Sequence, residues 1–194
     1  MSDITNDVLW RRLRYMLTPQ WDIYHSLGGL VEGQRVLEIG FGTGTGMLQL
    51  AARAESVTGV ELNTQAVQFA QLVYPLRNGR WLEGDVLDLP QTLRSPFDAA
   101  VMIEVLEHVS DWKRALANVR TALKPGGRLY ISSRNANADL RRNDLHEREV
   151  TAAEFTQMLG QYFSPVVLYD YQLQTQLTNT TRMTPLVAVG WKGT

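Results

Sequence analysis

A glycine-rich loop follows an apolar segment at residues 36–46, which read Val-Leu-Glu-Ile-Gly-Phe-Gly-Thr-Gly-Thr-Gly. Glycine lacks a Cβ atom, so the backbone of such a loop can adopt positive φ angles and lie directly against a ligand. Residues 47–51 continue in an amphipathic helical pattern, and the first N–H groups of that helix would face the same space. A strand, a glycine loop and a helix in this order indicate a site for a nucleotide-like ligand beside a parallel sheet.

The spacing of the glycines distinguishes two classes of ligand. A dinucleotide fingerprint requires Gly-x-Gly-x-x-Gly with a pyrophosphate at the helix N-terminus, whereas Thr45 stands here in place of the third glycine. Glu38 comes just before the loop, where a carboxylate would repel a pyrophosphate and attract an ammonium group. The loop and Glu38 together favour a cationic ligand over a nicotinamide dinucleotide.

Polar residues also follow the other apolar segments that we expect to form strands. Ligands of open α/β sheets bind outside the carboxyl ends of the strands. Glu61 can accept hydrogen bonds from both hydroxyls of a ribose, and Leu62 offers an apolar face to a purine. Asp85 can accept a hydrogen bond from an exocyclic amine, and Val86 adds a further apolar surface. With Glu38 beside the loop, these groups describe adenosine joined to a cationic amino acid.

Strand-like and helix-like segments alternate along the chain. We therefore expect an α/β fold with a doubly wound, seven-stranded, mostly parallel, Rossmann-like sheet and an antiparallel C-terminal edge hairpin. The expected strands cover residues 36–39, 56–60, 81–83, 97–103, 128–132, 165–173 and 185–191. The expected helices cover residues 47–51, 64–74, 112–123 and 151–162, with more helical residues within 7–30. Asn63 or Thr64, Asp111, and Thr151 with Glu154 are the expected N-terminal caps.

Length and composition narrow the class of protein. The chain has 194 residues, which suits one domain with a sizeable core. Its formal net charge of −1 gives no global attraction to nucleic acid or to anionic membranes. The chain contains no cysteine, which excludes disulfides and thiolate chemistry. No segment has the length and apolarity of a membrane span or a signal core, so we expect a soluble cytoplasmic protein.

Taken together, these segments resemble the class I S-adenosylmethionine-dependent methyltransferase family. The resemblance rests on the order and spacing of residues 36–46, 61–62, 84–90, 97–109 and 123–132. It implies the strand order 3-2-1-4-5-7-6 and S-adenosyl-L-methionine as the methyl donor on the glycine loop. It also implies a single domain over residues 1–194, with an N-terminal helical lid at 1–33 and a cofactor-binding core at 34–194.

The resemblance also implies which residues bind the cofactor. Those near its methionyl part are Glu38, Gly40, Phe41, Gly42 and Gly44. Those near its ribose and purine are Glu61, Leu62, Asp85 and Val86, and Ile103 and Glu104 close the other side of the site.

Methyl transfer from a sulfonium is a displacement that depends on in-line approach and desolvation more than on acid or base groups. A hydroxyl acceptor would still benefit from a base that removes its proton. His108 follows the fourth strand on the ligand side and is the candidate catalytic base, because an unperturbed histidine pKa of about 6.5 suits that task. A structural role at the strand–helix junction is one alternative. The other is a metal site formed by Glu104, Glu107, His108 and His146, although we expect no metal.

The later part of the chain bears on the acceptor. Residues 132–135 and 144–149 resemble segments of methyltransferases that act on glycans, lipids and quinone precursors. This resemblance implies a small-molecule or glycan-like acceptor that is methylated at oxygen. One alternative is a metal-assisted RNA 2′-O-methyltransferase. Another is a protein that binds S-adenosylmethionine without catalysis, as a scaffold or sensor.

Overall fold

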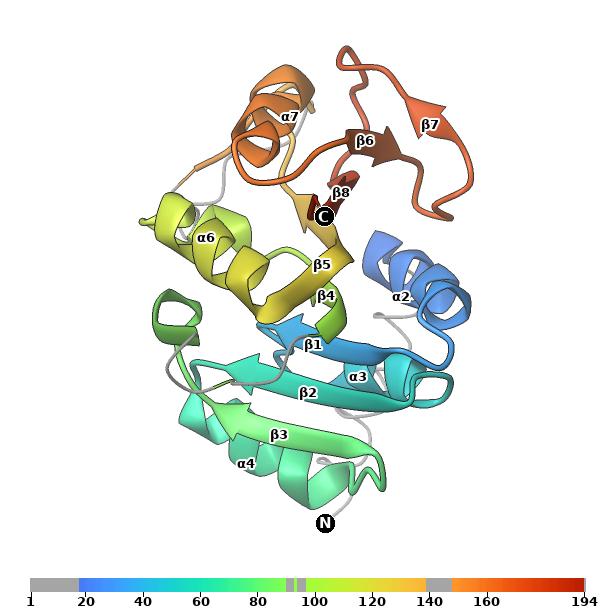
Figure 1. Cartoon of the computed structure of the whole chain (residues 1–194), viewed down its shortest axis with the longest axis vertical. Helices are drawn as coiled ribbons and strands as arrows, with labels where there is room; N and C mark the ends of the chain where they lie inside the picture. Colours follow the sequence, from blue (N-terminus) through green and yellow to red (C-terminus); the bar gives the residue numbers. More distant parts are fainter. Residues whose placement is uncertain (1–17, 90–92, 94–96, 139–147, 194) are drawn as a thin grey trace, which may run out of the picture.

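The computed structural model describes residues 18–89, 93, 97–138 and 148–193, so residues 1–17, 90–92, 94–96, 139–147 and 194 lie outside the description. Within it, the chain forms one mixed sheet with helices on both faces (Figure 1). The first half of the expected lid, and His146 of the alternative metal site, fall outside the described residues.

The sheet has the strand order β3-β2-β1-β4-β5-β8-β6-β7. Strands β1 to β5 run parallel, while β8 pairs antiparallel with β5 and with β6, and β6 pairs antiparallel with β7. The strands are β1 (Arg35–Ile39), β2 (Ser56–Glu61), β3 (Gly79–Glu83), β4 (Phe97–Met102), β5 (Leu123–Ser133), β6 (Val166–Tyr169), β7 (Gln176–Leu177) and β8 (Leu186–Trp191).

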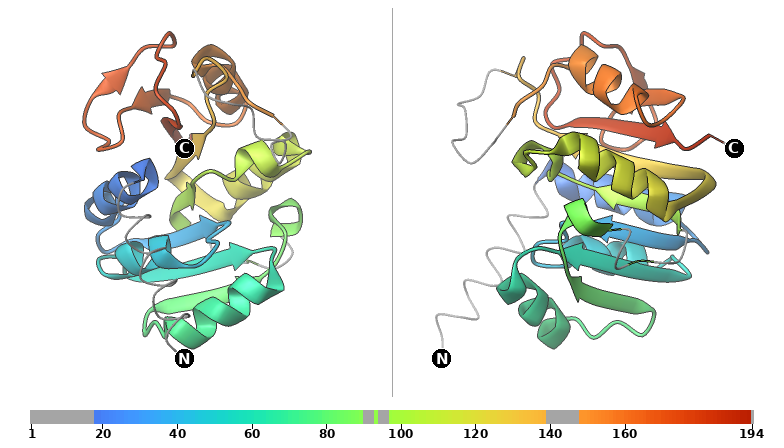
Figure 2. Two further views of the ribbon diagram at one scale, coloured as in Figure 1. Left: turned by 180° about the vertical axis from the view of Figure 1, so that it is seen from behind. Right: turned by 60° about the vertical axis from the view of Figure 1, so that its left-hand side comes forward.

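Two groups of helices cover the two faces of the sheet (Figure 2). One apolar core joins the sheet to α2 (Pro19–Leu30), α3 (Thr45–Ala51) and α4 (Thr64–Val73). The other joins it to α6 (Trp112–Ala122), α7 (Ala152–Gly160) and the short 3₁₀ helices η1 (Val86–Asp88) and η2 (Leu106–His108). Among the described residues, no helix is long and apolar enough to cross a membrane.

The helix starts follow the capping residues that the sequence offers. The Asn63 side chain accepts from the main-chain N–H groups of the first turn of α4, and Asp111 does the same for α6. Thr151 and Glu154 form a reciprocal capping box at the start of α7. These three predictions are confirmed, and they fix where each helix leaves the carboxyl edge of the sheet.

The predicted α/β class, the parallel core and the antiparallel C-terminal edge are confirmed, and the predicted strand order holds with β8 as its seventh strand. The prediction of seven strands is wrong, because the sheet has eight. The additional strand β7 lies in the polar segment between the two final predicted strands and pairs with Leu168 and Tyr169. Two residues are too few to show an alternating pattern, so the sequence gives no signal for this strand.

Candidate functional site

The glycine loop after β1 adopts the backbone angles that its composition allows. Gly40, Gly42 and Gly44 have φ angles of 69°, 52° and 83°, in the left-handed region that side chains disfavour. Gly44 is the N-cap of α3, and a Cβ atom there would lie 2.8 Å from the ring of Trp81. The backbone angles therefore favour glycine at all three positions, and close packing against Val105 and Trp81 also requires it at Gly40 and Gly44.

Glu61 at the end of β2 ties the glycine loop to the start of α4. Its Oε2 accepts a hydrogen bond of 2.9 Å from the N–H of Gly42, and its Oε1 accepts one of 2.9 Å from the N–H of Asn63. Each carboxylate oxygen can accept more than one hydrogen bond. Glu61 is therefore oriented by the main chain and still has acceptor capacity for a ligand hydroxyl.

A cleft of about 300 Å³ opens at the carboxyl ends of the first four strands. This is the place where an open α/β sheet binds its ligand. Its lining includes Glu61 and the exposed side chain of Leu62, together with Asp85, whose Oδ1 caps η1 through the N–H of Leu87 at 2.8 Å. The lining residues are Ile39, Gly40, Val60, Glu61, Leu62, Gly84, Asp85, Val86, Glu104, Val105, His108 and Val109. The structure thus brings Gly40, Glu61, Leu62, Asp85, Val86, Glu104 and His108 of the prediction into one cleft.

The remaining predicted residues do not line this cleft. Phe41 is buried against Trp81, with their ring centroids 4.9 Å apart, and Ile103 is also buried. Gly42 and Gly44 shape the neighbouring loop, as described above. Glu38 is fully buried on the α2 side of the sheet, where its Oε1 accepts a hydrogen bond of 2.5 Å from the hydroxyl of Tyr24.

The environment of Glu38 opposes its negative charge. Burial raises the pKa of Glu38 to about 8, against the lowering effect of the Tyr24 hydrogen bond. The Oε2 atom of Glu38 has no hydrogen-bond partner among the described residues. Glu38 is therefore largely protonated at neutral pH in the structure as it stands. Sequence reasoning found Glu38 but not Tyr24, since nothing in the spacing links α2 to β1.

Two consecutive serines on β5 bind the two carboxylates of the Glu-x-x-Glu-His segment. Glu104 adopts a positive φ of 55°, its N–H donates to Ser132 Oγ at 3.0 Å, and Ser132 Oγ donates back to Glu104 Oε1 at 3.1 Å. Ser133 Oγ donates to Glu107 Oε2 at 3.3 Å. Burial raises the pKa of Glu107 to about 7. His108 is exposed at the rim of the cleft.

The metal alternative has little support in the described part of the chain. There, no three side chains of His, Asp or Glu come together in a way that could hold a metal ion. Glu104 and Glu107 are directed to different serines, and Glu107 is buried. His146, which would complete the set, lies outside the described residues.

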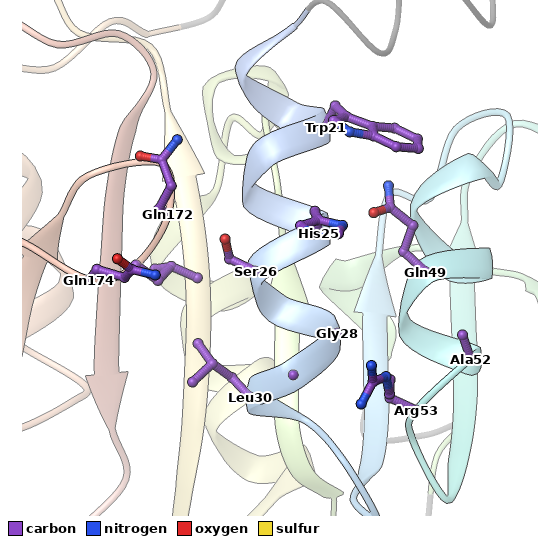
Figure 3. A pocket seen from close by; sticks show the side chains of 12 residues that line it. Trp21, His25, Ser26, Gly28, Leu30, Gln49, Ala52, Arg53, Gln172 and Gln174 are labelled. Carbon is purple, nitrogen blue, oxygen red and sulfur yellow. The ribbon is translucent and has the colours of Figure 1, made fainter.

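A larger hollow of about 670 Å³ lies along α2 (Figure 3). Figure 3 shows Trp21 and His25 on the side of α2 that faces Gln49 and Arg53, with Gln172 and Gln174 beyond its other side. The lining contains no carboxylate and none of the residues predicted to bind the cofactor or to act as base. The smaller cleft, which gathers the polar strand ends, is therefore the candidate site.

The sequence profile of the family described as "Methyltransferase domain" matches residues 37–131. This range contains every residue that lines the cleft. The matched part of the chain is a class I methyltransferase domain. The family predicted from the sequence is therefore confirmed.

Individual relatives of this methyltransferase domain agree with that result. The O-methyltransferase rstn1 of Aspergillus nomiae is 36% identical over 107 residues, which are 53% of this chain and 47% of that protein. A ubiquinone biosynthesis O-methyltransferase of Idiomarina loihiensis is 36% identical over 109 residues, which are 54% of this chain and 44% of that protein. The chain thus spans less than half the length of these two curated relatives.

A solved structure shows the same fold over nearly the whole chain. The TehB-like SAM-dependent methyltransferase from Corynebacterium glutamicum superposes with a TM-score of 0.72 and 20% identity, and the match covers 97% of this chain and 96% of that one. The methyltransferase fold therefore extends through α7 and the C-terminal strands, beyond the range that the family profile matches.

Proposed function

We propose that this chain binds S-adenosylmethionine in the cleft and transfers its methyl group to an oxygen atom of a small-molecule or glycan-like acceptor. The observation that carries the proposal is the convergence of Gly40, Glu61, Asp85 and His108 in one cleft at the carboxyl ends of the strands. We extend the proposal to residues 1–194 acting as one methyltransferase domain, whose lid includes the described residues 18–33.

The chemistry of the lining fits such a cofactor. Glu61 is held by two main-chain N–H groups and would accept the ribose hydroxyls. The apolar side chains of Leu62 and Val86 would face the purine, and the Asp85 carboxylate would accept from its exocyclic amine. The lining contains three carboxylates and no cation other than the titratable His108, which suits a positively charged ligand and opposes a pyrophosphate.

When bound, S-adenosylmethionine supplies a methyl group on a positively charged sulfur, which is transferred without a redox step. The residues of the chain orient the acceptor, exclude water and remove its proton. His108 lies at the rim of the cleft, where a neutral ring nitrogen could accept the proton of a hydroxyl. Glu104, fixed by Ser132, would form the adjacent wall.

An oxygen acceptor is favoured by the names of the two curated relatives, both of which are called O-methyltransferases. The matches cover 53% and 54% of this chain and less than half of each relative, so the acceptor itself is inferred from chemistry. A base at the cleft serves a hydroxyl, whose proton must leave as the new carbon–oxygen bond forms.

The test combines binding and turnover. Calorimetry should show binding of S-adenosylhomocysteine to the chain and no binding of NADH. The chain should then be incubated with isotopically labelled S-adenosylmethionine and a panel of phenols, catechols, saccharides and short RNAs, with products identified by mass spectrometry. A labelled O-methyl product from a small acceptor supports the proposal. Cofactor binding with no product would favour the non-catalytic alternative, and an RNA product abolished by EDTA would favour the RNA enzyme.

A further inference from the structure

A second recess lies at the opposite end of the sheet from the cleft, where β1, β2 and β3 begin. It measures about 560 Å³, and its lining includes Arg35, Arg77 and Arg80. We refer to it as the arginine recess. Figure 1 shows β2 and β3 from the face concerned, with α4 behind them. Nothing in the proposed methyl-transfer chemistry uses this end of the sheet.

The strand register places the polar groups of the arginine recess side by side. Arg35 on β1 pairs with Ser56 on β2, and Thr58 on β2 pairs with Arg80 on β3. Ser56 and Thr58 are two residues apart, so their side chains project from the same face of the sheet. Paired residues of neighbouring strands also share a face, at a spacing of about 5 Å. Arg35, Ser56, Thr58 and Arg80 therefore share one face of the sheet, and all four line the recess, although Thr58 is largely buried.

The other side of this sheet is occupied by the apolar core. Val57 and Trp81 alternate with Ser56, Thr58 and Arg80 along β2 and β3, and both are buried in the core that includes α3 and α4. Because residues of a strand alternate between its two faces, the polar residues Ser56, Thr58 and Arg80 all lie on the face opposite to this core. Arg80 is exposed, Ser56 is partly buried and Thr58 is buried, and together they form a polar patch near the start of β2 and β3.

The local charge of the arginine recess is positive. Its lining contains three arginines and no carboxylate, although the whole chain has a net charge of −1. Arg77 and Arg80 form no ion pair with another described residue. The nearby carboxylate of Asp98 accepts from the main-chain N–H of Arg35 at 2.8 Å and is ion-paired with Lys124. Arg35 itself lies over the ring of Phe97, 6.0 Å from its centroid.

We propose that the arginine recess binds a small ligand through a phosphate group. Guanidinium groups match the geometry of phosphate oxygens, and the hydroxyls of Ser56 and Thr58 can donate to further oxygens. The volume of the recess suits a phosphorylated metabolite or a mononucleotide. A nucleic acid is less suited, because it would need a basic surface that extends beyond one recess. The proposal stands independently of the methyl-transfer function.

Pyrophosphate is the probe that tests this proposal. Its affinity should be measured by calorimetry at a fixed ionic strength set with chloride, first for the unmodified chain and then for the double variant Arg77→Gln/Arg80→Gln. Loss of two charge-assisted contacts should weaken pyrophosphate binding by about ten- to hundredfold. Arg182→Gln, which removes an exposed arginine elsewhere, is the matched control and should bind as the unmodified chain does.

Two further measurements make the result decisive. Glu61→Ala should leave pyrophosphate affinity unchanged, because Glu61 lines the other cleft. AMP should compete with pyrophosphate, as expected if the phosphate group is what the recess recognises. The proposal is overturned if the unmodified chain does not bind pyrophosphate, if the double variant binds it equally well, or if Glu61→Ala abolishes binding. Binding of short RNA without binding of pyrophosphate would also overturn it.

Discussion

Replacing Glu38 by glutamine should remove a penalty on folding that grows with pH. The Glu38 carboxyl is fully buried, its Oε1 accepts from Tyr24, and its Oε2 has no partner among the described residues. Burial raises its pKa from 4.5 to about 8. The glutamine side chain has nearly the same shape, keeps an oxygen for the Tyr24 hydroxyl and carries no charge at any pH.

The sign of the effect follows from which state binds the proton. Below pH 4.5 the carboxyl is protonated in both the folded and the unfolded chain, so pH has no effect through this group. Between pH 4.5 and about 8 the unfolded chain releases the proton while the folded chain retains it. The free energy of unfolding therefore falls by about 1.4 kcal/mol per pH unit in this window, or about 5 kcal/mol in total.

Urea denaturation between pH 5 and pH 9 measures this effect. At pH 5 the glutamine variant and the unmodified chain should have similar stabilities, whereas at pH 8 the variant should be more stable by several kcal/mol. Glu107→Gln is a comparison variant, because burial also raises the pKa of Glu107, to about 7. The loss of unfolding free energy that Glu107 causes with rising pH should therefore level off about one pH unit below that of Glu38. Parallel stability profiles for Glu38→Gln and the unmodified chain would refute the assignment of Glu38 as a buried, protonated carboxyl.

Three other substitutions test the site and its loop. Glu61→Ala should weaken S-adenosylhomocysteine binding by about 2–4 kcal/mol in calorimetry, because the ribose contacts and the hydrogen bond from Gly42 N–H are both lost. An unchanged affinity would exclude Glu61 from the site. His108→Ala should lower turnover about a hundredfold. It should change the affinity for S-adenosylhomocysteine and the free energy of unfolding little, since this side chain is exposed. Undiminished turnover would refute the role of His108 as base. Gly44→Ala should lower the free energy of unfolding by about 3 kcal/mol in urea denaturation, because φ at this position is 83° and the new Cβ would meet the Trp81 ring. A loss below about 0.5 kcal/mol would contradict the predicted backbone strain and clash.

The site residues that the sequence could predict are those at the ends of strands. Glu61 is the last residue of β2 and Asp85 lies two residues after the end of β3, and parallel strands bring such positions to one edge of a sheet whatever the helices between them contain. The glycine loop was predictable for a different reason, because repeated glycines permit the positive φ angles that let the backbone lie against a ligand. The order of the parallel strands followed from the family resemblance rather than from the pattern of apolar residues.

Residues within strands were harder to place, and Glu38 shows why. Leu37 and Ile39 pack in one core while Val36 packs in the other, so Glu38 belongs to the face covered by α2. Every residue from Val36 to Ile39 is buried, and a strand buried on both faces shows no alternation of polar and apolar residues. The hydroxyl of Tyr24 then reaches Glu38 from a helix whose position relative to β1 no local pattern specifies.

The strand β5 explains why the two acids of the Glu-x-x-Glu-His segment do not act together. Neighbouring residues of a strand project to opposite faces of the sheet, so Ser132 and Ser133 present their hydroxyls on opposite sides. Tyr130, which shares its face with Ser132, packs in the core beneath α2, whereas Ile131, which shares its face with Ser133, packs beneath α6. Glu104 is hydrogen-bonded to Ser132 and Glu107 to Ser133, so the two carboxylates point to opposite sides of the sheet although they are close in sequence. Of this segment, Glu104 and the exposed His108 line the cleft, and His108 is the residue that we propose as the base.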